Sequence, residues 1–322
     1  MQSLRAQALL LCLLVIGSAG CGASGSGGPG GGGGGGGPTP TVGPTLSPGP
    51  HFYTTDGQSP GHIYVWNIPL SSTSTPALVV NTTGNVPYNM CFDNANHMVV
   101  TFRNTTEVFV YNLPLTASSV PAFVLSMPGG STDCHFDPSG NLYVAGTNTN
   151  NIAVFTAPVS ASSTISSNIV ANVNGPWGVS ADANHVYVSN LTNETMYSNL
   201  AGGNALQATF STQFDNYGII VGPDGNLYVS NVIAANEIDL FHFPITNSST
   251  PDPAHRIMVQ PNTPSHCITY ISFDSSGNLY IVGSDDVDPT FNHIYVYAPP
   301  YTTQTLNLST GTIKLRGDQV GP

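Results

Sequence analysis

Three aspartates in one short segment have the most obvious chemistry in this sequence. Asp285, Asp286 and Asp288 lie in the segment SDDVDPTFN, which covers residues 284–292. Carboxylate oxygens are the hard ligands that Ca²⁺ prefers, so this segment is a candidate site for Ca²⁺ or another divalent metal. It lacks the glycine and terminal glutamate of a twelve-residue calcium loop, and a solvated acidic turn explains the same residues.

A second group combines aromatic side chains with asparagine or aspartate at one recurring position, where the chain enters a predicted innermost strand. Such side chains can stack on a sugar or a flat apolar ligand and hydrogen-bond its polar groups. The same residue types also pack neighbouring strands at a crowded axis, which is the competing interpretation. The ligand-binding candidates are Tyr88, Asn89, Asp133, Trp177, Tyr217 and Tyr270, together with His266 from a longer connector.

Candidates for catalysis are few. Asp133 and His135 are two positions apart and share one face if the segment is a strand, where they could bind a metal or act as acid and base. No third ligand is identifiable for them. The glutamates Glu107, Glu194 and Glu237 all occupy one repeat position, so the repeat accounts for them without a catalytic role. These residues favour a binding module over an enzyme and identify no catalytic residue.

The charge composition excludes whole classes of partner. The 322-residue chain has five Lys plus Arg against 17 Asp plus Glu, a net charge of −12. Neutralising phosphates needs clustered lysine and arginine, so nucleic acid is excluded, as is electrostatic attachment to anionic lipid. Hydrophobic residues make up 40% of the chain, and the polar residues are mainly Asn, Ser and Thr, which favour turns and strands.

Two signatures recur after residue 50 with a period of about 44 residues. The first, such as FDPSGNLYVA from Phe136, is an apolar residue and aspartate, a turn and a strand, which predicts a hairpin. The second, such as HIYVWNIPL from His62, is an alternating strand followed by proline. A linker rich in serine and threonine and a short fourth strand complete each unit.

This repeat predicts an all-β fold, a six-bladed β-propeller with four antiparallel strands per blade, over residues 51–322. One four-stranded blade cannot bury both its faces, so the blades must stack around an axis. The first blade lacks its innermost strand. We expect residues 311–316 to supply it from the C-terminus, so that strands from both termini close the ring, with residues 41–46 as the alternative.

The pattern resembles NHL-repeat propellers and their relatives, the gluconolactonase-like and virginiamycin B lyase-like proteins. The FDPSGNLYVA hairpins, the polar-Ile-x-Val-aromatic strands that follow them and Pro-Trp-Gly-Val at residues 176–179 carry this resemblance. It implies ligands at the mouth of the central channel. The related enzymes hold a divalent metal with a glutamate plus asparagine and aspartate, or rely on a histidine and glutamate pair, and no matching isolated set is visible here.

Two insertions interrupt the repeat, at residues 251–266 and 284–292. We interpret the first as a connector between blades and the second as a loop between a second and a third strand, which places both on one face. Insertions on one face of a repeat protein often mark its binding face. We therefore expect a protein or carbohydrate ligand at that mouth of the channel.

The first 50 residues are not part of the predicted propeller. Residues 1–20 have the charged start, short apolar run and small residues of an export signal, and the apolar run is too short to span a bilayer. The sequence Ser18-Ala19-Gly20-Cys21 resembles a bacterial lipobox, which implies lipidation at Cys21. Residues 21–50, rich in glycine and proline, form a flexible tether. We expect a monomeric, membrane-anchored lipoprotein facing the periplasm or cell surface, with secretion after cleavage behind Ala19 as the alternative.

Cys12 lies in the export signal, and the predicted propeller contains Cys91, Cys134 and Cys267, which could form one disulfide and one free thiol or stay as three thiols. Taken together, the sequence predicts an exported binding or scaffold module. The alternatives are a metal-dependent lactonase or lyase of the same fold, and an adhesive or structural envelope protein.

Overall fold

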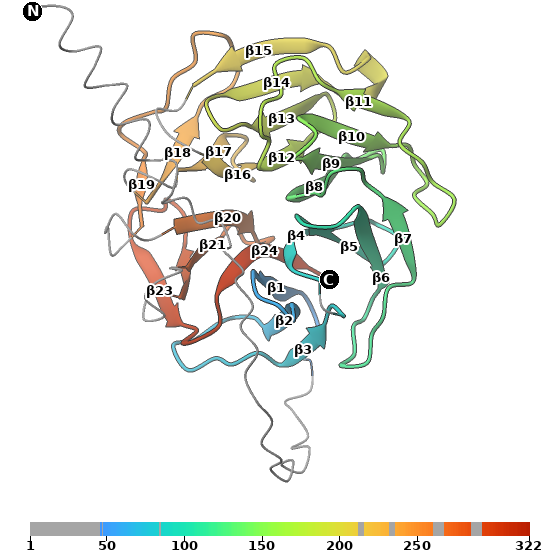
Figure 1. Cartoon of the computed structure of the whole chain (residues 1–322). Coiled ribbons are helices and arrows are strands. Elements are labelled where there is room, and N and C mark those ends of the chain that lie inside the picture. The colour runs from blue at the N-terminus through green and yellow to red at the C-terminus, as the bar shows by residue number, and fades with distance from the viewer. Residues whose placement is uncertain are drawn as a thin grey trace, which may run out of the picture. The chain divides into compact units, whose positions relative to one another are not determined.

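The computed structural model describes residues 46, 48–83, 85–211, 216–231, 236–259, 267–284 and 292–322. The chain divides into two units, Met1–Thr41 and Val42–Pro322, and all the described residues belong to the second. This unit is a ring of six four-stranded antiparallel sheets around a central axis (Figure 1). The predicted six-bladed β-propeller is confirmed, and the only helical segment among the described residues is the 3-10 turn η2 (Leu200–Gly202).

The blades follow one another in chain order, and their strands run from the axis outward as follows. Blade 1 contains β24 (Leu315–Gly321), β1 (His51–Asp56), β2 (His62–Asn67) and β3 (Leu78–Asn81). Blade 2 contains β4 (Pro87–Phe92), β5 (His97–Phe102), β6 (Glu107–Asn112) and β7 (Phe123–Ser126). Blade 3 contains β8 (Asp133–Phe136), β9 (Leu142–Gly146), β10 (Asn151–Phe155) and β11 (Ser167–Ile169).

The second half of the ring repeats this order. Blade 4 contains β12 (Gly178–Ala181), β13 (His185–Ser189), β14 (Glu194–Ser198) and β15 (Leu206–Phe210). Blade 5 contains β16 (Asn216–Val221), β17 (Leu227–Asn231), β18 (Glu237–Phe241) and β19 (Ile257–Met258). Blade 6 contains β20 (Cys267–Phe273), β21 (Leu279–Ser284), β22 (His293–Tyr297) and β23 (Gln304–Ser309).

The C-terminal strand closes the ring, as predicted. β24 pairs antiparallel with β1, from His51 opposite Gly321 to Asp56 opposite Leu315. The predicted bounds of 311–316 are corrected to 315–321, because Gly311 has a φ of +62° and belongs to the turn after β23. The strand therefore starts after this turn and continues almost to the end of the chain. It forms the innermost strand of blade 1, for which residues 41–46 were the alternative.

Where the hairpin signature has its aspartate, that residue holds the turn together. In blade 3, Asp137 accepts hydrogen bonds from the backbone N–H of Asn141 at 2.9 Å, from its side-chain amide at 2.8 Å and from the Tyr143 hydroxyl at 3.3 Å. Asp274, Asn278 and Tyr280 repeat the arrangement in blade 6. Because the aspartate satisfies the turn, the hairpin stays short while its flanking strands alternate between the two faces of the blade.

The apolar core is divided into six clusters, one between each pair of neighbouring blades. In blade 1, for example, Tyr53, Ile63 and Val65 pack toward blade 2, while Phe52 and Trp66 pack toward blade 6. Successive residues of a strand point to opposite faces, so each blade supplies both of its interfaces. The blades are therefore stable as a ring rather than singly.

Serine and threonine hydroxyls at the end of several second strands join each blade to the next. Thr55 donates to the Tyr88 carbonyl at 2.7 Å, Ser189 to the Tyr217 carbonyl at 2.6 Å, and Ser230 to the Thr269 carbonyl at 2.6 Å. Each acceptor lies where the chain enters the next innermost strand. These bonds fix the spacing of the innermost strands, which sets the width of the central channel.

A disulfide bond joins Cys91 in β4 to Cys134 in β8, the innermost strands of blades 2 and 3. The sequence left open whether the three propeller cysteines form a disulfide or stay as thiols, and the structure contains one disulfide. The pairing fixes two neighbouring blades close to the axis.

Candidate functional site

The two ends of the channel differ. At the entry face, connectors enter the innermost strands and the second strands end. At the hairpin face, each innermost strand turns back into the second strand. The ligand-binding candidates predicted from the sequence are expected at the entry face.

Three of these candidates form one aromatic cluster at the entry face. The Trp177 ring stacks on the Tyr217 ring with centroids 4.3 Å apart and lies 5.9 Å from the Tyr88 ring. The Arg103 guanidinium lies 4.6 Å from the centroid of the Trp177 ring, and its Nη1 donates to the Tyr88 hydroxyl at 3.2 Å. Tyr88 belongs to blade 2 and Trp177 leads into blade 4, so the cluster covers the entrance of blade 3 between them. Arg103 was not singled out in the sequence.

Tyr270 extends from blade 6 across the channel to the opposite side of the ring. Its hydroxyl lies 3.0 Å from the carbonyl oxygens of both Thr132 and Trp177, which belong to the entrances of blades 3 and 4. The side chain is only 2% exposed, and burial raises its pKa well above the usual value. Tyr270 therefore fills the channel and acts as a donor to backbone carbonyls.

A buried polar group lies among the innermost strands. The Asp133 carboxylate accepts from the Asn89 side chain at 2.6 Å and from the backbone N–H groups of Cys134 and Val179, each at 2.8 Å. Burial raises the pKa of Asp133 to about 7, against these three N–H groups, which favour its charged form. Asp318 on β24 is buried near it, and burial raises its pKa well above the usual range.

The predicted candidates at this mouth are thus brought together, but as a packed plug. Their side chains are 2–6% exposed: Tyr88, Asn89, Asp133, Trp177, Tyr217 and Tyr270. Among the described residues they contact one another, Arg103 and backbone groups. His266, the metal candidates Asp285, Asp286 and Asp288, and the lipidation candidate Cys21 lie outside the described residues and stay predictions.

Asp133 and His135, for which an acid–base or metal role was considered, both make structural contacts to blade 4. Both side chains cap backbone N–H groups of β12, since Asp133 accepts from Val179 and the His135 Nδ1 accepts from Ala181 at 3.2 Å. Innermost strands expose N–H groups toward the axis, and these two residues satisfy them. The pair therefore binds blade 3 to blade 4.

The insertion at 251–266 was misinterpreted as one connector between blades. The fourth strand β19 lies within it, and the N–H of Asp252 donates to the Leu240 carbonyl near the end of β18, on the hairpin face. The first part of the insertion, before β19, is therefore on the face opposite to the expected one. Residues 260–266 and 285–291, which carry the rest of the two insertions, lie outside the described residues.

The hairpin face carries an open depression. Two adjoining hollows of about 450 and 600 Å³ share Phe92, Asp93, Asn94, His135 and Phe136. The smaller one is also lined by the end of β24, and the larger one extends over Pro138, Pro158 and Val159. Half-buried phenylalanines, prolines and a few polar groups are typical of a small-ligand site, and the volume is in the usual range.

His135 supplies the defined donor of this depression. Its Nδ1 accepts the Ala181 N–H, so the neutral ring carries its proton on Nε2. Burial lowers the pKa of His135 to about 4, which keeps the ring neutral at pH 7. Phe92 and Phe136 were read in the sequence only as parts of the hairpin signature. Their signal was the phenylalanine before aspartate in two consecutive blades.

The structure is similar to many known propellers. A protein of unknown function from Bacteroides caccae matches with a TM-score of 0.62 at 11% identity, over 84% of this chain and 98% of that one. A chain of a nidogen/laminin complex matches with a TM-score of 0.60 at 13% identity, over 85% of this chain and 99% of that one. Virginiamycin B lyase from Staphylococcus aureus matches with a TM-score of 0.54 at 14% identity, over 82% and 84%.

These likenesses show the propeller fold alone. No family model and no curated protein sequence matches this chain. Within the described ranges, no helix is long and apolar enough to cross a membrane.

Proposed function

We propose that this propeller is a binding module, and that its ligand is a small molecule or side chain with a flat apolar face and a hydrogen-bond acceptor. The observation that supports this most strongly is the depression on the hairpin face, where Phe92 and Phe136 flank His135. The phenylalanine rings offer apolar area for stacking, and the Nε2–H of His135 offers one donor. The described entry mouth, by contrast, is filled by the plug around Tyr270.

Small aromatic probes test this proposal. Saturation-transfer difference NMR with indole, quinoline and benzamide should give signals with the parent chain. Phe136→Ala should weaken them at least tenfold, because it removes one wall of the depression. Phe273→Ala is the matched control, since Phe273 has the same repeat position in blade 6, away from the depression. Binding that survives Phe136→Ala, or a parent chain that binds none of the probes, would contradict the proposal.

The proposal includes export and lipid anchoring through Cys21. Its support is the apolar run and small residues before Cys21 and the glycine-rich segment after it. Expressed in a bacterium with its own first 20 residues, the parent chain should fractionate with membranes, while Cys21→Ser should be released in soluble form. Membrane fractionation of Cys21→Ser equal to that of the parent would exclude the anchor.

A further inference from the structure

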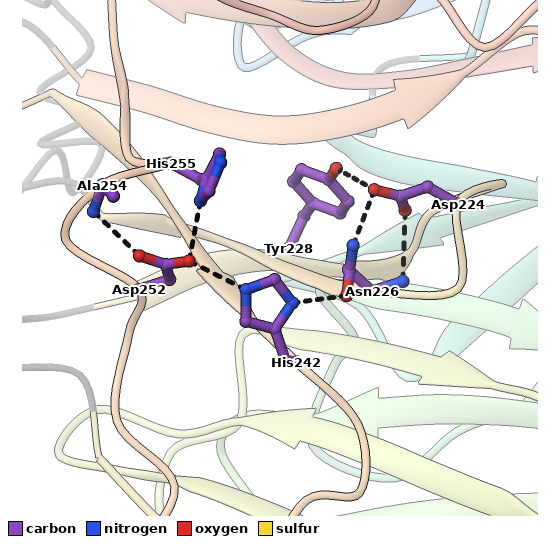
Figure 2. Close-up of polar contacts among 7 residues, drawn as sticks. All are labelled: Asp224, Asn226, Tyr228, His242, Asp252, Ala254 and His255. Atoms are coloured by element: carbon purple, nitrogen blue, oxygen red, sulfur yellow. Dashed lines mark hydrogen bonds and ion pairs between the residues drawn. The ribbon is translucent and has the colours of Figure 1, made fainter.

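Two histidines and an aspartate converge on the hairpin side of blade 5. His242 follows β18, while Asp252 and His255 belong to the segment that leads to β19 (Figure 2). The Asp252 Oδ2 lies 2.8 Å from the His242 Nε2 and 2.7 Å from the His255 Nδ1. The three potential ligand atoms all lie within 4.8 Å of one another, the one such group found among the described residues.

An insertion of four residues creates this group. In blades 1 to 3, the N–H of Ala77, Ala122 or Ser166 bonds to the third strand, and the fourth strand starts at the next residue. Asp252 makes the equivalent bond to Leu240 in blade 5, but β19 starts only at Ile257. Residues 253–256 are therefore extra, and they place His255 beside Asp252.

The insertion is held at its other end as well. Arg256, the residue after His255, forms ion pairs with Glu237 at 3.3 Å and Asp239 at 2.8 Å on β18. Both carboxylates are at most 3% exposed, so these contacts fix the backbone of the insertion. They also direct the arginine charge toward β18 rather than toward the two histidines.

The proton positions in this group are fixed by its neighbours. Asn226 donates through its Nδ2 to the Asp224 carboxylate at 2.8 Å, which also accepts the Tyr228 hydroxyl at 2.7 Å. The Oδ1 of Asn226 therefore faces the His242 Nδ1, 2.9 Å away, and that nitrogen must carry a proton. Figure 2 shows this chain of contacts from Tyr228 to His255.

The other nitrogen of His242, Nε2, then faces a second acceptor, the Asp252 carboxylate. In a neutral ring with its proton on Nδ1, the Nε2 is a lone pair, yet it lies 2.8 Å from a carboxylate oxygen of Asp252. Two acceptors at this distance repel unless a cation lies between them. The cation is either a second proton on His242 or a metal ion, and a histidine that donates its far N–H to a fixed acceptor is the usual arrangement of a metal ligand.

We propose that His242, Asp252 and His255 form a binding site for a borderline divalent transition-metal ion, of which Zn²⁺ is the test ion. Imidazole nitrogens with one carboxylate suit Zn²⁺, at ligand distances of about 2.0 to 2.2 Å. In a tetrahedral site, the distance from the Asp252 oxygen to each histidine nitrogen must increase by roughly 0.6 Å. The His242 and His255 side chains are 58% and 64% exposed, so they can make this movement and leave a fourth position to water.

Asn226 and Asp224 are the positioning residues of this site, since they hold the His242 ring in the tautomer that presents Nε2. The site lies in blade 5, whereas the depression is lined by blades 1 to 4. It is also separate from the Ca²⁺ candidate at Asp285, Asp286 and Asp288. Hard cations prefer all-oxygen sites, so Ca²⁺ should not compete for two imidazoles.

Isothermal titration of the full chain with ZnCl₂ tests the proposal, after removal of bound metal with a chelator. The parent chain should bind one Zn²⁺ ion that a tenfold excess of CaCl₂ does not displace. His242→Ala and His255→Ala should each weaken this binding at least tenfold, and the double variant should abolish it. Asn226→Ala should weaken it by about 10- to 100-fold, the usual effect of losing a residue that orients a ligand.

His97→Ala is the matched control. His97 contacts Asp93 at 2.7 Å in blade 2, so it is also a histidine–aspartate pair, but it has no second histidine. Its loss should leave Zn²⁺ binding unchanged. Unchanged circular dichroism and urea midpoints of the metal-free variants show that the fold is intact. No saturable Zn²⁺ binding by the parent, or equal binding by the double variant, would overturn the proposal and leave the second proton on His242 as the cation.

Discussion

The hydroxyl of Tyr270 should contribute measurably to stability, because it joins opposite sides of the ring. Tyr270→Phe keeps the ring in the channel and removes only the donor that the Thr132 and Trp177 carbonyls share. Loss of a buried hydrogen bond that leaves an acceptor without its donor costs about 1 to 2 kcal/mol. For a domain of this size, such a loss should lower the Tm by about 3 °C.

Tyr111→Phe is the matched control for this prediction. Tyr111 is 1% exposed, and its hydroxyl has no hydrogen-bond partner among the described residues. Its removal should leave the free energy of unfolding unchanged or raise it, since an unsatisfied buried hydroxyl is costly. Urea unfolding followed by fluorescence measures both variants. A Tyr270→Phe variant as stable as Tyr111→Phe would refute the view that Tyr270 joins the two sides of the channel.

Three further predictions concern the innermost strands and the contacts that join them to neighbouring blades. Exchanging both Cys91 and Cys134 for alanine should lower the free energy of unfolding by up to about 4 kcal/mol, because the disulfide closes a segment of 43 residues; urea midpoints equal to those of the oxidised parent would contradict this. Ser230→Ala removes the bonds that its hydroxyl makes with the Thr269 carbonyl and the Gly218 N–H and should cost about 2 kcal/mol in thermal unfolding, whereas exposed Ser248→Ala should change stability by less than about 0.5 kcal/mol. Because burial raises the pKa of Asp318, the folded chain keeps a proton that the unfolded chain releases above about pH 4, so stability should fall as the pH rises above that value. Asp318→Asn should make this fall in urea midpoints between pH 4.5 and 8 smaller, with the rest of the fall coming from Asp133, whose pKa burial also raises. An unchanged slope would show that Asp318 does not contribute to it.

Most of the fold was predictable because the same hairpin and strand signatures recur in successive repeats. The hairpins follow from aspartate, a turn and alternating strand residues, and Gly140, Gly225 and Gly277 have the positive φ expected of their turns. The bounds of the closing strand were less predictable. That strand has no hairpin signature, and only the place of the turn at Gly311 decides where it starts.

The spacing of two cysteines in the sequence indicates which pair forms the disulfide. Cys91 and Cys134 are 43 residues apart, almost one repeat, so they fall on innermost strands of neighbouring blades. Sequence alone did not show that their side chains face each other, because that depends on the stacking of the two sheets.

The character of the entry mouth could not be predicted either. Aromatic residues at the entrances were found from the repeat, but whether they line a pocket or fill it depends on how far each side chain extends across the axis. The Tyr270 side chain reaches carbonyl groups of the opposite blades, and a sequence pattern does not predict a contact across the channel. The residues of the proposed zinc site were missed because Asp252 and His255 lay in a segment interpreted as a connector, although the extra residues before β19 marked it as irregular.

If the proposed function is right, ligands bind at the hairpin face and not at the filled entry mouth. An amide and indole ¹H–¹⁵N spectrum, recorded during titration with the probe that binds best, tests it directly. The chain has only two tryptophans, so the Trp177 indole N–H reports on the entry mouth and the buried Trp66 serves as reference. The amides of Gly140 and Ala181, beside the depression, should shift while the Trp177 indole does not. A shift of the Trp177 indole with Gly140 and Ala181 unmoved would contradict it.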